Sequence, residues 1–286
     1  MRELKIKKTT LKIGIKNPIT FIHTSDTHIA HDDERVSNRA AVFDACDPGR
    51  IEDYFFKTVE YAKEKGYTIV HTGDLIDFTS NACFDFVDKY FNDVDYIYAA
   101  GNHDFCHWVG EAKEDLAYKW EQFKVTAPHF KNNLYFYSRM IGEVNFVTLD
   151  NSYSRITYGQ LDALKAEVAK GHPIILCMHV PLYSPAFDAE ISKKHGGKEI
   201  APLYNMGVPE DIQDAYIAKH PEVAHHKQIL DEASWAAVDY IKNEPAIKAL
   251  LVGHRHEEVE GVLENGKPQI MAHGTFSGYI REITVE

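Results

Sequence analysis

Five stretches of apolar, strand-like sequence are each followed at once by residues of the types that bind metal ions. The residues that follow them are Asp26-Thr27-His28, Gly73-Asp74-Leu75-Ile76-Asp77, Gly101-Asn102-His103-Asp104, His179 and Gly253-His254-Arg255-His256. In open α/β sheets, binding sites form outside the carboxyl ends of the strands, where side chains can converge without filling the core. The order and positions of these motifs therefore predict an α/β fold with one composite polar site.

The rest of the chain alternates between strand-like and helix-like patterns. Apolar residues at spacings of three and four predict helices over the ranges Arg50–Lys65, Asn81–Phe91, Ala112–Phe123, Tyr158–Ala169 and Ala233–Lys242. Short β-rich runs predict strands over the ranges Ile19–Thr24, Tyr67–Thr72, Tyr96–Ala100, Leu134–Met140, Val144–Asp150, Pro173–Met178 and Ala246–Val252. A final antiparallel meander is expected over Glu258–Leu263, Gln269–His273 and Tyr279–Val285.

A single large domain spanning residues 1–286 is expected, because α/β domains often exceed 200 residues. The segment 184–231 departs from the regular pattern, since it is polar, rich in His and Lys, and too long for an ordinary loop. It is interpreted as an insertion lying over the site, with a pair of surface helices unrelated to substrate as the alternative. Most of its histidines are expected on a solvated face, namely His195, His220, His225 and His226.

Charge and composition restrict the classes of partner and the compartment. The net charge of −12 is a poor match for a protein that binds an extended nucleic acid, but it suits a site that concentrates divalent cations. The sequence has no membrane-span-length apolar run and no signal-peptide pattern at its start. Its four cysteines have no disulfide-like spacing: Cys46, Cys83, Cys106 and Cys177. Buried thiols in a cytoplasmic protein are therefore predicted.

The chemistry of the predicted ligands indicates which metals they would bind. His254 and His256 are two residues apart, so in an extended segment both rings point to the same side. A carboxylate such as Asp74 has two oxygens and can bridge two cations. The whole set consists of imidazole nitrogens and of carboxylate or amide oxygens without thiolate, which suits two divalent ions of Mn, Fe, Zn or Ni.

From Asp26 to His256, the five motifs resemble those of the calcineurin-like metallophosphoesterase family. The resemblance implies a four-layer α/β/β/α sandwich with two mixed β-sheets. It also implies two metal positions that share Asp74, the first completed by Asp26, His28 and His256 and the second by Asn102, His179 and His254. His103 would lie beside the substrate phosphate, with Asp104 orienting it.

Such a site would hydrolyse a phosphate ester. Two ions about 3.5–4 Å apart can stabilise both the attacking and the leaving oxygen, and a metal-bridging hydroxide would attack phosphorus without any protein nucleophile. His103 could donate a proton to the leaving oxygen or stabilise charge on the phosphate.

Departures from particular branches of the family limit the substrate class. The protein Ser/Thr phosphatases carry arginines soon after the Gly-Asp and Gly-Asn-His motifs, and here Phe and Thr follow Asp77 while Phe and Cys follow Asp104. Purple acid phosphatases place a tyrosine ligand where this chain has Asp77, which is instead expected to stabilise its loop or a histidine that lies behind the metal ligands. The motif spelling resembles the phosphodiesterase and nuclease branches.

A phosphodiester of a small molecule or nucleotide is therefore the predicted substrate. A phosphomonoester, a nuclease substrate, and a catalytically silent metal-binding scaffold remain as alternatives. The sequence contains no fingerprint for a base, sugar or lipid head group, and it does not predict the oligomeric state.

Overall fold

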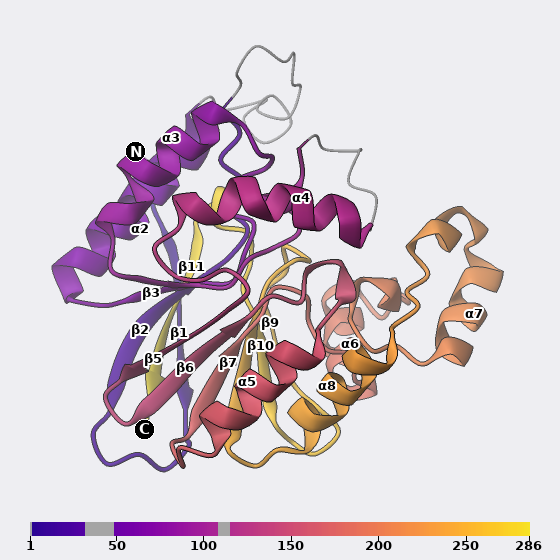
Figure 1. Cartoon of the computed structure of the whole chain (residues 1–286). Coiled ribbons are helices and arrows are strands. Elements are labelled where there is room, and N and C mark those ends of the chain that lie inside the picture. Colours follow the sequence, from indigo (N-terminus) through magenta and orange to yellow (C-terminus); the bar gives the residue numbers. More distant parts are fainter. Residues whose placement is uncertain (1, 32–48, 108–114) are drawn as a thin grey trace.

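The computed structural model describes residues 2–31, 49–107 and 115–286, and its strands form two mixed sheets (Figure 1). The first sheet has the order β1 (Lys5–Leu11), β11 (Tyr279–Val285), β2 (Ile19–Thr24), β3 (Ile69–His71) and β4 (Tyr96–Tyr98). The second has the order β5 (Phe136–Ile141), β6 (Val144–Leu149), β7 (Ile174–Cys177), β8 (Ile247–Val252), β10 (Pro268–Met271) and β9 (Val259–Val262).

Strand direction brings the predicted motifs to one end of the sheets. Strands β2, β3 and β4 are mutually parallel in the first sheet, and β6, β7 and β8 are parallel in the second. Their carboxyl ends therefore lie at the same edge within each sheet. Motif residues follow β2, β3, β4, β7 and β8, as the sequence predicts.

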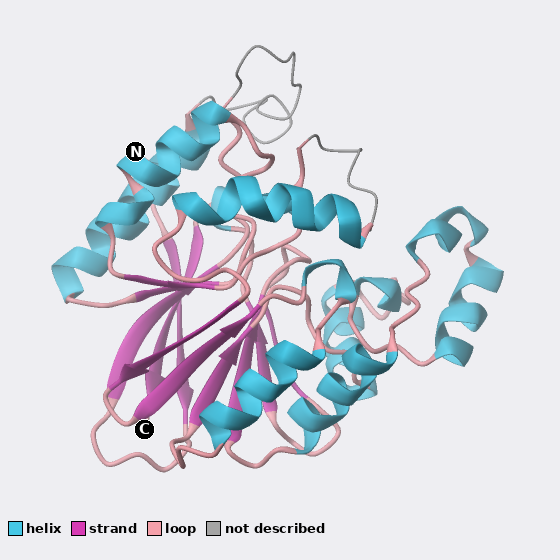
Figure 2. Ribbon diagram, in the orientation of Figure 1, coloured by secondary structure: helices cyan, strands magenta, loops and turns pink. Residues whose placement is uncertain are grey.

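The sheets pack face to face, with helices on their outer faces (Figure 2). Phe21 of β2 meets Phe146 of β6 edge to face, with ring centroids 5.0 Å apart. Helices α2 (Arg50–Lys65) and α3 (Asn81–Lys89) cover the first sheet, and α5 (Tyr158–Val168) and α8 (Glu232–Asn243) cover the second. This arrangement confirms the four-layer α/β/β/α architecture.

Local sequence explains where the helices begin and end. The apolar side of α2 buries Ile51, Phe55, Val59 and Ala62, and the helix ends at Gly66, which adopts a left-handed conformation. Helix α5 begins with a capping box between Thr157 and Gln160. Short 3₁₀ turns lie between these elements: η1 (Phe91–Asp93), η2 (His103–Phe105), η3 (Ala127–His129), η4 (Ser152–Ser154) and η7 (Thr275–Ser277).

Two edges of the fold differ from the sequence prediction. Strand β1 was not predicted, because its Lys-Ile-Lys-Lys-Thr-Thr-Leu sequence is charged and mostly exposed; main-chain pairing with β11 holds it at the sheet edge. The predicted meander is correct for the antiparallel pair β9–β10 but wrong for β11, which lies in the other sheet between β1 and β2. Helix α4 (Leu116–Thr126) begins where Asp115 caps it, and positions 112–114 of its predicted range, like Cys46, lie outside the described residues.

Segment 184–231 divides into a buried and a peripheral part. Helix α6 (Pro185–Lys194) packs against β9 and buries Phe187 and Ile191 fully in the core of the second sheet. Beyond it come η5 (Pro202–Tyr204), α7 (Glu210–Lys219) and η6 (Pro221–His226), and α7 lies at the margin of the molecule (Figure 1). The beginning of the segment therefore belongs to the core. Within the described parts of the chain, no helix is long and apolar enough to cross a membrane.

Candidate metal centre

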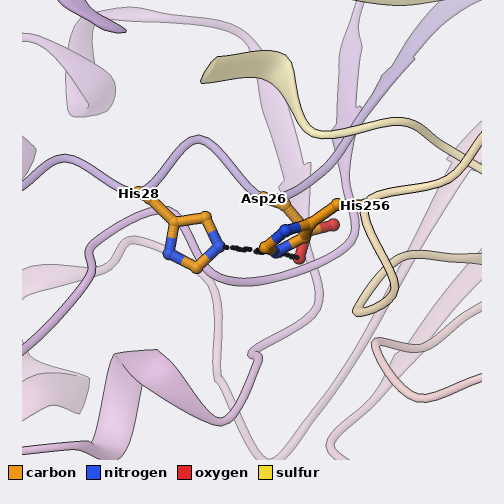
Figure 3. Close-up of side chains that lie close together, drawn as sticks. All are labelled: Asp26, His28 and His256. Carbon is orange, nitrogen blue, oxygen red and sulfur yellow. Dashed lines mark hydrogen bonds and ion pairs between the residues drawn. The ribbon is translucent and has the colours of Figure 1, made fainter. Parts of the chain in front are cut away.

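The loops after five strands bring the predicted ligands together in two adjoining groups. One group contains Asp26, His28 and His256 (Figure 3). In this group Nε2 of His28 lies 3.0 Å from Nε2 of His256, which is 3.3 Å from Oδ1 of Asp26. All three side chains come from the ends of β2 and β8, which belong to different sheets.

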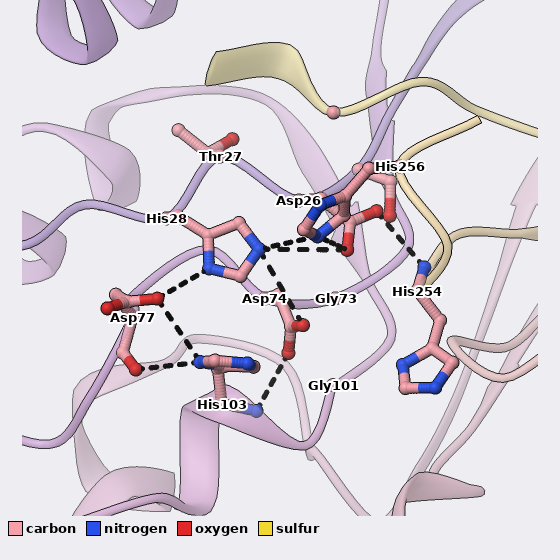
Figure 4. Close-up of polar contacts among 12 residues, drawn as sticks. Asp26, Thr27, His28, Gly73, Asp74, Asp77, Gly101, His103, His254 and His256 are labelled. Atoms are coloured by element: carbon pink, nitrogen blue, oxygen red, sulfur yellow. Dashed lines mark hydrogen bonds and ion pairs between the residues drawn. The ribbon is translucent and has the colours of Figure 1, made fainter. Parts of the chain in front are cut away.

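The second group contains Asp74, His179, His254 and Asn102. Nε2 of His179 lies 3.1 Å from Oδ2 of Asp74, 3.2 Å from Oδ1 of Asn102 and 3.2 Å from Nδ1 of His254. Oδ2 of Asp74 is also 3.9 Å from Nε2 of His28 in the first group. Asp74 therefore lies between the two groups (Figure 4).

The ring nitrogen of His179 that faces away from the site donates a hydrogen bond. This leaves hydrogen-bond acceptors facing one another inside the site. Nδ1 of His179 donates to the carbonyl of Thr72 at 2.7 Å, so its Nε2 presents a lone pair to the oxygens of Asp74 and Asn102 unless it carries a second proton. Oδ1 of Asp26 is fully buried and accepts no hydrogen bond within the described part of the chain, although Nε2 of His256 lies 3.3 Å away. Lone pairs that converge in a buried space fit a bound cation, so the residues present suit divalent metal ions.

The electrostatics of the site agree with this fit. Burial opposes protonation of His179, yet the carboxylates of Asp74 and Asp26 raise its pKa to about 9. At His254, burial lowers the pKa more than the same two carboxylates raise it, so the pKa of His254 falls to about 3. The protein groups alone therefore produce a negative region at His179 that favours positive charge, here a second proton that a bound metal ion would replace, and they keep the imidazole of His254 neutral.

The backbone at the ligands is strained. Asp26, His28, Asp74, His254 and His256 all have positive φ, between 52° and 75°. Non-glycine residues seldom adopt this left-handed region, and such strain is concentrated at functional sites, where the surrounding structure maintains it. The conformation turns these side chains from the strand ends into the shared space.

Two motif glycines are required by close approach between loops. A Cβ atom at Gly101 would lie 2.2 Å from Oδ1 of Asp74, and one at Gly253 would lie 1.8 Å from Oγ of Ser25. Any larger residue would push the motif loops apart. Glycine at these two positions therefore serves close packing between loops.

His103 lies at the edge of the site, where its side chain is 20% exposed. Its Nδ1 contacts Asp77, at 2.9 Å from the carbonyl oxygen and 3.2 Å from Oδ1. The same carboxylate oxygen is 2.8 Å from Nδ1 of His28. Asp77 thus holds both a predicted ligand and the predicted catalytic histidine, which agrees with the expectation that it supports its loop or a histidine.

Asp104 contacts other groups than the ring of His103. Its carboxylate accepts hydrogen bonds from the backbone N–H groups of Asp74, Leu75 and Gly101, at 2.7–3.2 Å, and from the hydroxyl of Tyr98. It therefore joins the loop after β3 to the loop after β4. No contact between Asp104 and the ring of His103 supports the expectation that Asp104 orients it. Asp77 contacts Nδ1 of His103 instead.

A cavity of about 450 Å³ opens beside the second ligand group. Asn102 and His254 lie on its inner side, and residues of segment 184–231 contribute Tyr204, His225, His226 and Gln228. His225 is exposed and His226 partly exposed, in line with the expected solvated face, and both also line the cavity. Sequence patterns missed these residues because no strand end or ligand-type spacing marks them, and Tyr153 and Ser154, which also line the cavity, were likewise missed.

Comparison with protein-family models finds one that covers most of the chain. The model described as calcineurin-like phosphoesterase matches residues 19–258, which include every motif above. The chain belongs to the calcineurin-like phosphoesterase family. As a member of that family it is a metal-dependent phosphoesterase, and its candidate metal-binding residues are the two groups described here, with His103 also within reach of His28 and Asp74. Comparison with curated proteins found no match.

Solved structures related to this calcineurin-like phosphoesterase have low sequence identity. A proposed 5′-nucleotidase from Staphylococcus aureus is 14% identical over 91% of this chain, with a TM-score of 0.47, and the match covers 49% of its length. A dimetal phosphatase from Danio rerio is 14% identical, with 90% and 88% of the two chains covered and a TM-score of 0.43. The calcineurin-like phosphoesterase YfkN from Bacillus subtilis is 13% identical, with 91% and 82% covered and a TM-score of 0.43.

Proposed function

We propose that the protein hydrolyses phosphate esters with two divalent metal ions bound by seven residues. Asp26, His28 and His256 would hold one ion, and Asn102, His179 and His254 the other, with Asp74 shared. The observation that carries this proposal is the place of Asp74, whose Oδ2 lies 3.1 Å from His179 of one group and 3.9 Å from His28 of the other. When bound, the ions would supply a nucleophile at neutral pH and neutralise charge on the phosphate.

His103 is proposed to act as the proton donor to the leaving oxygen. Although burial opposes protonation, the charge of Asp74 and the hydrogen bond with Asp77 raise the pKa of His103 to about 9. A protonated imidazole at the open edge of the site can donate a proton or stabilise an oxyanion. Asp77 would accept a hydrogen bond from Nδ1 of His103, so Nε2 of the same ring would be available to the substrate.

A phosphodiester is the proposed preferred substrate, with a small-molecule phosphomonoester as the second candidate. A monoester carries one more negative charge than a diester near neutral pH. Among the described residues that line the cavity, none is Lys or Arg, so the cavity offers the additional charge no cationic partner. Candidate metals are Mn, Fe, Zn and Ni, since the donors are imidazole nitrogens and carboxylate or amide oxygens.

Two further proposals concern organisation and compartment. We propose a single domain over residues 1–286, in which the later part of segment 184–231 covers the site, because Tyr204, His225 and His226 line the cavity at the ligands. A cytoplasmic location is proposed because Cys83, Cys106 and Cys177 are buried thiols, as expected in a reducing compartment.

The test compares hydrolysis of bis(p-nitrophenyl) phosphate and p-nitrophenyl phosphate by protein loaded with Mn²⁺, with Asp74→Asn as the blank. We expect turnover of both by the wild type, a larger kcat/KM for the diester, and loss of both activities in the variant. A larger value for the monoester would reverse the order of substrates. Turnover of neither above the blank would favour the metal-binding scaffold and contradict the proposal.

A further inference from the structure

We propose that the cavity beside the second ligand group binds a planar, uncharged ring system that is esterified to the phosphate. This inference rests on the proposed function and adds the chemical class of the organic group. The cavity is continuous with the site, since Asn102 and His254 line it together with Tyr204 and Gln228. A phosphate held at the metal ligands would therefore direct one of its ester groups into this space.

The volume and the walls suit a ring. Small-molecule sites commonly enclose about 300–1,000 Å³, and this cavity has about 450 Å³. The Tyr204 ring lies 5.1 Å from that of His226, which lies 4.0 Å from that of His225. Tyr204 is 36% exposed although it is a large aromatic residue. Adjacent aromatic faces that are open to a cavity bind planar groups by stacking.

A hydrogen-bond acceptor without a partner lines the same cavity. Oε1 of Gln228 is buried and accepts no hydrogen bond from the residues that the structure describes, while its Nε2 donates to the carbonyl of Leu203. The buried side chain of Gln213 fixes this residue, because its Oε1 accepts from the Gln228 N–H at 2.8 Å and its Nε2 donates to the Gln228 carbonyl at 3.0 Å. A ring with an N–H donor, such as an imide or an amine, would pair with this oxygen once the side-chain amide of Gln228 turns toward the cavity.

The charges near the cavity disfavour an ionic group. Of the described residues that line it, none is Lys, Arg, Asp or Glu. The guanidinium of Arg255, which is paired with Glu257 at 3.7 Å, lies 5.9 Å from the centre of the Tyr204 ring, so this ring already has a cation beside it. A neutral ring needs no partner of opposite charge in the cavity.

Arg255 also fixes the cavity wall relative to the metal ligands. It stands between His254 and His256 in the sequence, and its side chain is only 3% exposed. Its Nη1 donates to the carbonyl of Ala201 at 3.2 Å and to Oδ1 of Asn205 at 3.3 Å. The turn that carries Tyr204 is thereby joined directly to the motif that supplies two ligands.

The experiment uses three p-nitrophenyl diesters that release the same p-nitrophenol: those of thymidine 5′-phosphate, phosphorylcholine and ethyl phosphate. We expect kcat/KM for the thymidine ester to exceed that for the ethyl ester by about 10- to 100-fold, the usual size of a stacking contribution. The choline ester should show no advantage over the ethyl ester. Equal values for thymidine and ethyl esters, or a preference for choline, would overturn the inference.

Three variants of cavity residues test whether the preference for the thymidine ester arises in the cavity. Tyr204→Leu, His226→Ala and Gln228→Leu should each lower the ratio of kcat/KM for the thymidine ester to that for the ethyl ester, by about fivefold or more. His220→Ala is the matched control, because it makes the same change in the same segment outside the cavity. It should leave the ratio unchanged. A ratio that stays at the wild-type value in all three cavity variants would place ring recognition elsewhere and contradict the inference.

A binding measurement separates this inference from the proposed function. Calorimetric titration of Mn²⁺-loaded protein should give a Kd for thymidine 5′-monophosphate at least about tenfold lower than for inorganic phosphate. The difference should disappear in Tyr204→Leu. Absence of turnover with this difference intact would overturn only the proposed hydrolysis, whereas turnover without the difference would overturn only the ring-binding cavity.

Discussion

Asp77 contacts both His28 and His103 through one carboxylate oxygen, at 2.8 and 3.2 Å. Its position three residues after Asp74 indicates a supporting role, but only the folded loop shows which histidines it holds. The contacts fix the orientation of each ring and the nitrogen that faces the site, which is how groups around a metal tune its ligands. The proposed ligands could be selected from the sequence, because each follows a strand end and has a side chain suited to metals.

Residues outside the strand-end motifs could not be predicted in this way. Tyr204 and Gln228 enter the cavity from a turn and from the end of a 3₁₀ helix, where neither period nor spacing marks a functional side chain. The contacts of Asp104 were not predictable either, since they include the backbone N–H groups of Asp74 and Leu75 in the loop after β3. Contacts of this kind depend on tertiary structure and leave no local signal.

His103→Ala should lower kcat by about 10²–10⁴-fold, because the variant loses the group that would protonate the leaving oxygen. Metal content should stay at the wild-type value, since His103 belongs to neither proposed set of metal ligands. Elemental analysis and diester kinetics on the same sample provide the measurement. Loss of metal from the variant would instead identify His103 as a ligand.

At the scale of elements, the strands before the motifs were predictable and the edges of the sheets were not. Buried parallel strands such as β7 and β8 consist of continuous apolar residues, which sequence patterns detect. Strand β1 is held mainly by main-chain pairing with β11. Its charged side chains do not form the apolar pattern by which a strand is recognised in a sequence. The crossing of β11 to the first sheet depends on packing between distant parts of the chain.

Helix α6 should behave as part of the core, although it begins the segment predicted to be an insertion. Phe187 of this helix is fully buried, so Phe187→Ala should lower the free energy of unfolding by about 3–5 kcal/mol. Phe56→Ala on α2 is a control of identical chemistry, since Phe56 is 41% exposed, and it should cost much less. Urea denaturation gives both values; equal costs would show that α6 is a dispensable addition.

Glu260 of β9 joins the two sheets through Lys7 of β1, at 2.9 Å, and Arg281 of β11. Burial opposes its ionisation, but these cations hold the pKa of Glu260 at about 2, below its ordinary value of 4.5. Because the folded-state pKa is the lower one, this stabilisation is present above pH 4.5 and is lost as the pH falls toward 2.

Glu260→Gln should therefore lower the free energy of unfolding by about 1 kcal/mol at pH 7, a modest value because the carboxylate is partly exposed. The difference from wild type should narrow below pH 4.5 and vanish near pH 2. Thermal unfolding of both proteins across this range provides the measurement. A difference that grows as the pH falls would contradict the assigned sign.

For the whole molecule, the central feature is that two sheets contribute to one site. Asp26, Asp74 and Asn102 follow strands of the first sheet, whereas His179 and His254 follow strands of the second. The ligand groups can form only when the face-to-face packing around Phe21 and Phe146 is complete. Family resemblance predicts this architecture from the motifs, while the shape of the cavity beside the site depends on segment 184–231.

The number of Mn²⁺ ions bound per chain after reconstitution and desalting tests this account most directly. We predict two for the wild type and one or fewer for Asp74→Asn, because both ions would share that carboxylate. Asp85→Asn, which makes the same change at an exposed position of α3, should retain two. Fewer than two ions in the wild type, or two in Asp74→Asn, would contradict a dinuclear centre bridged by Asp74.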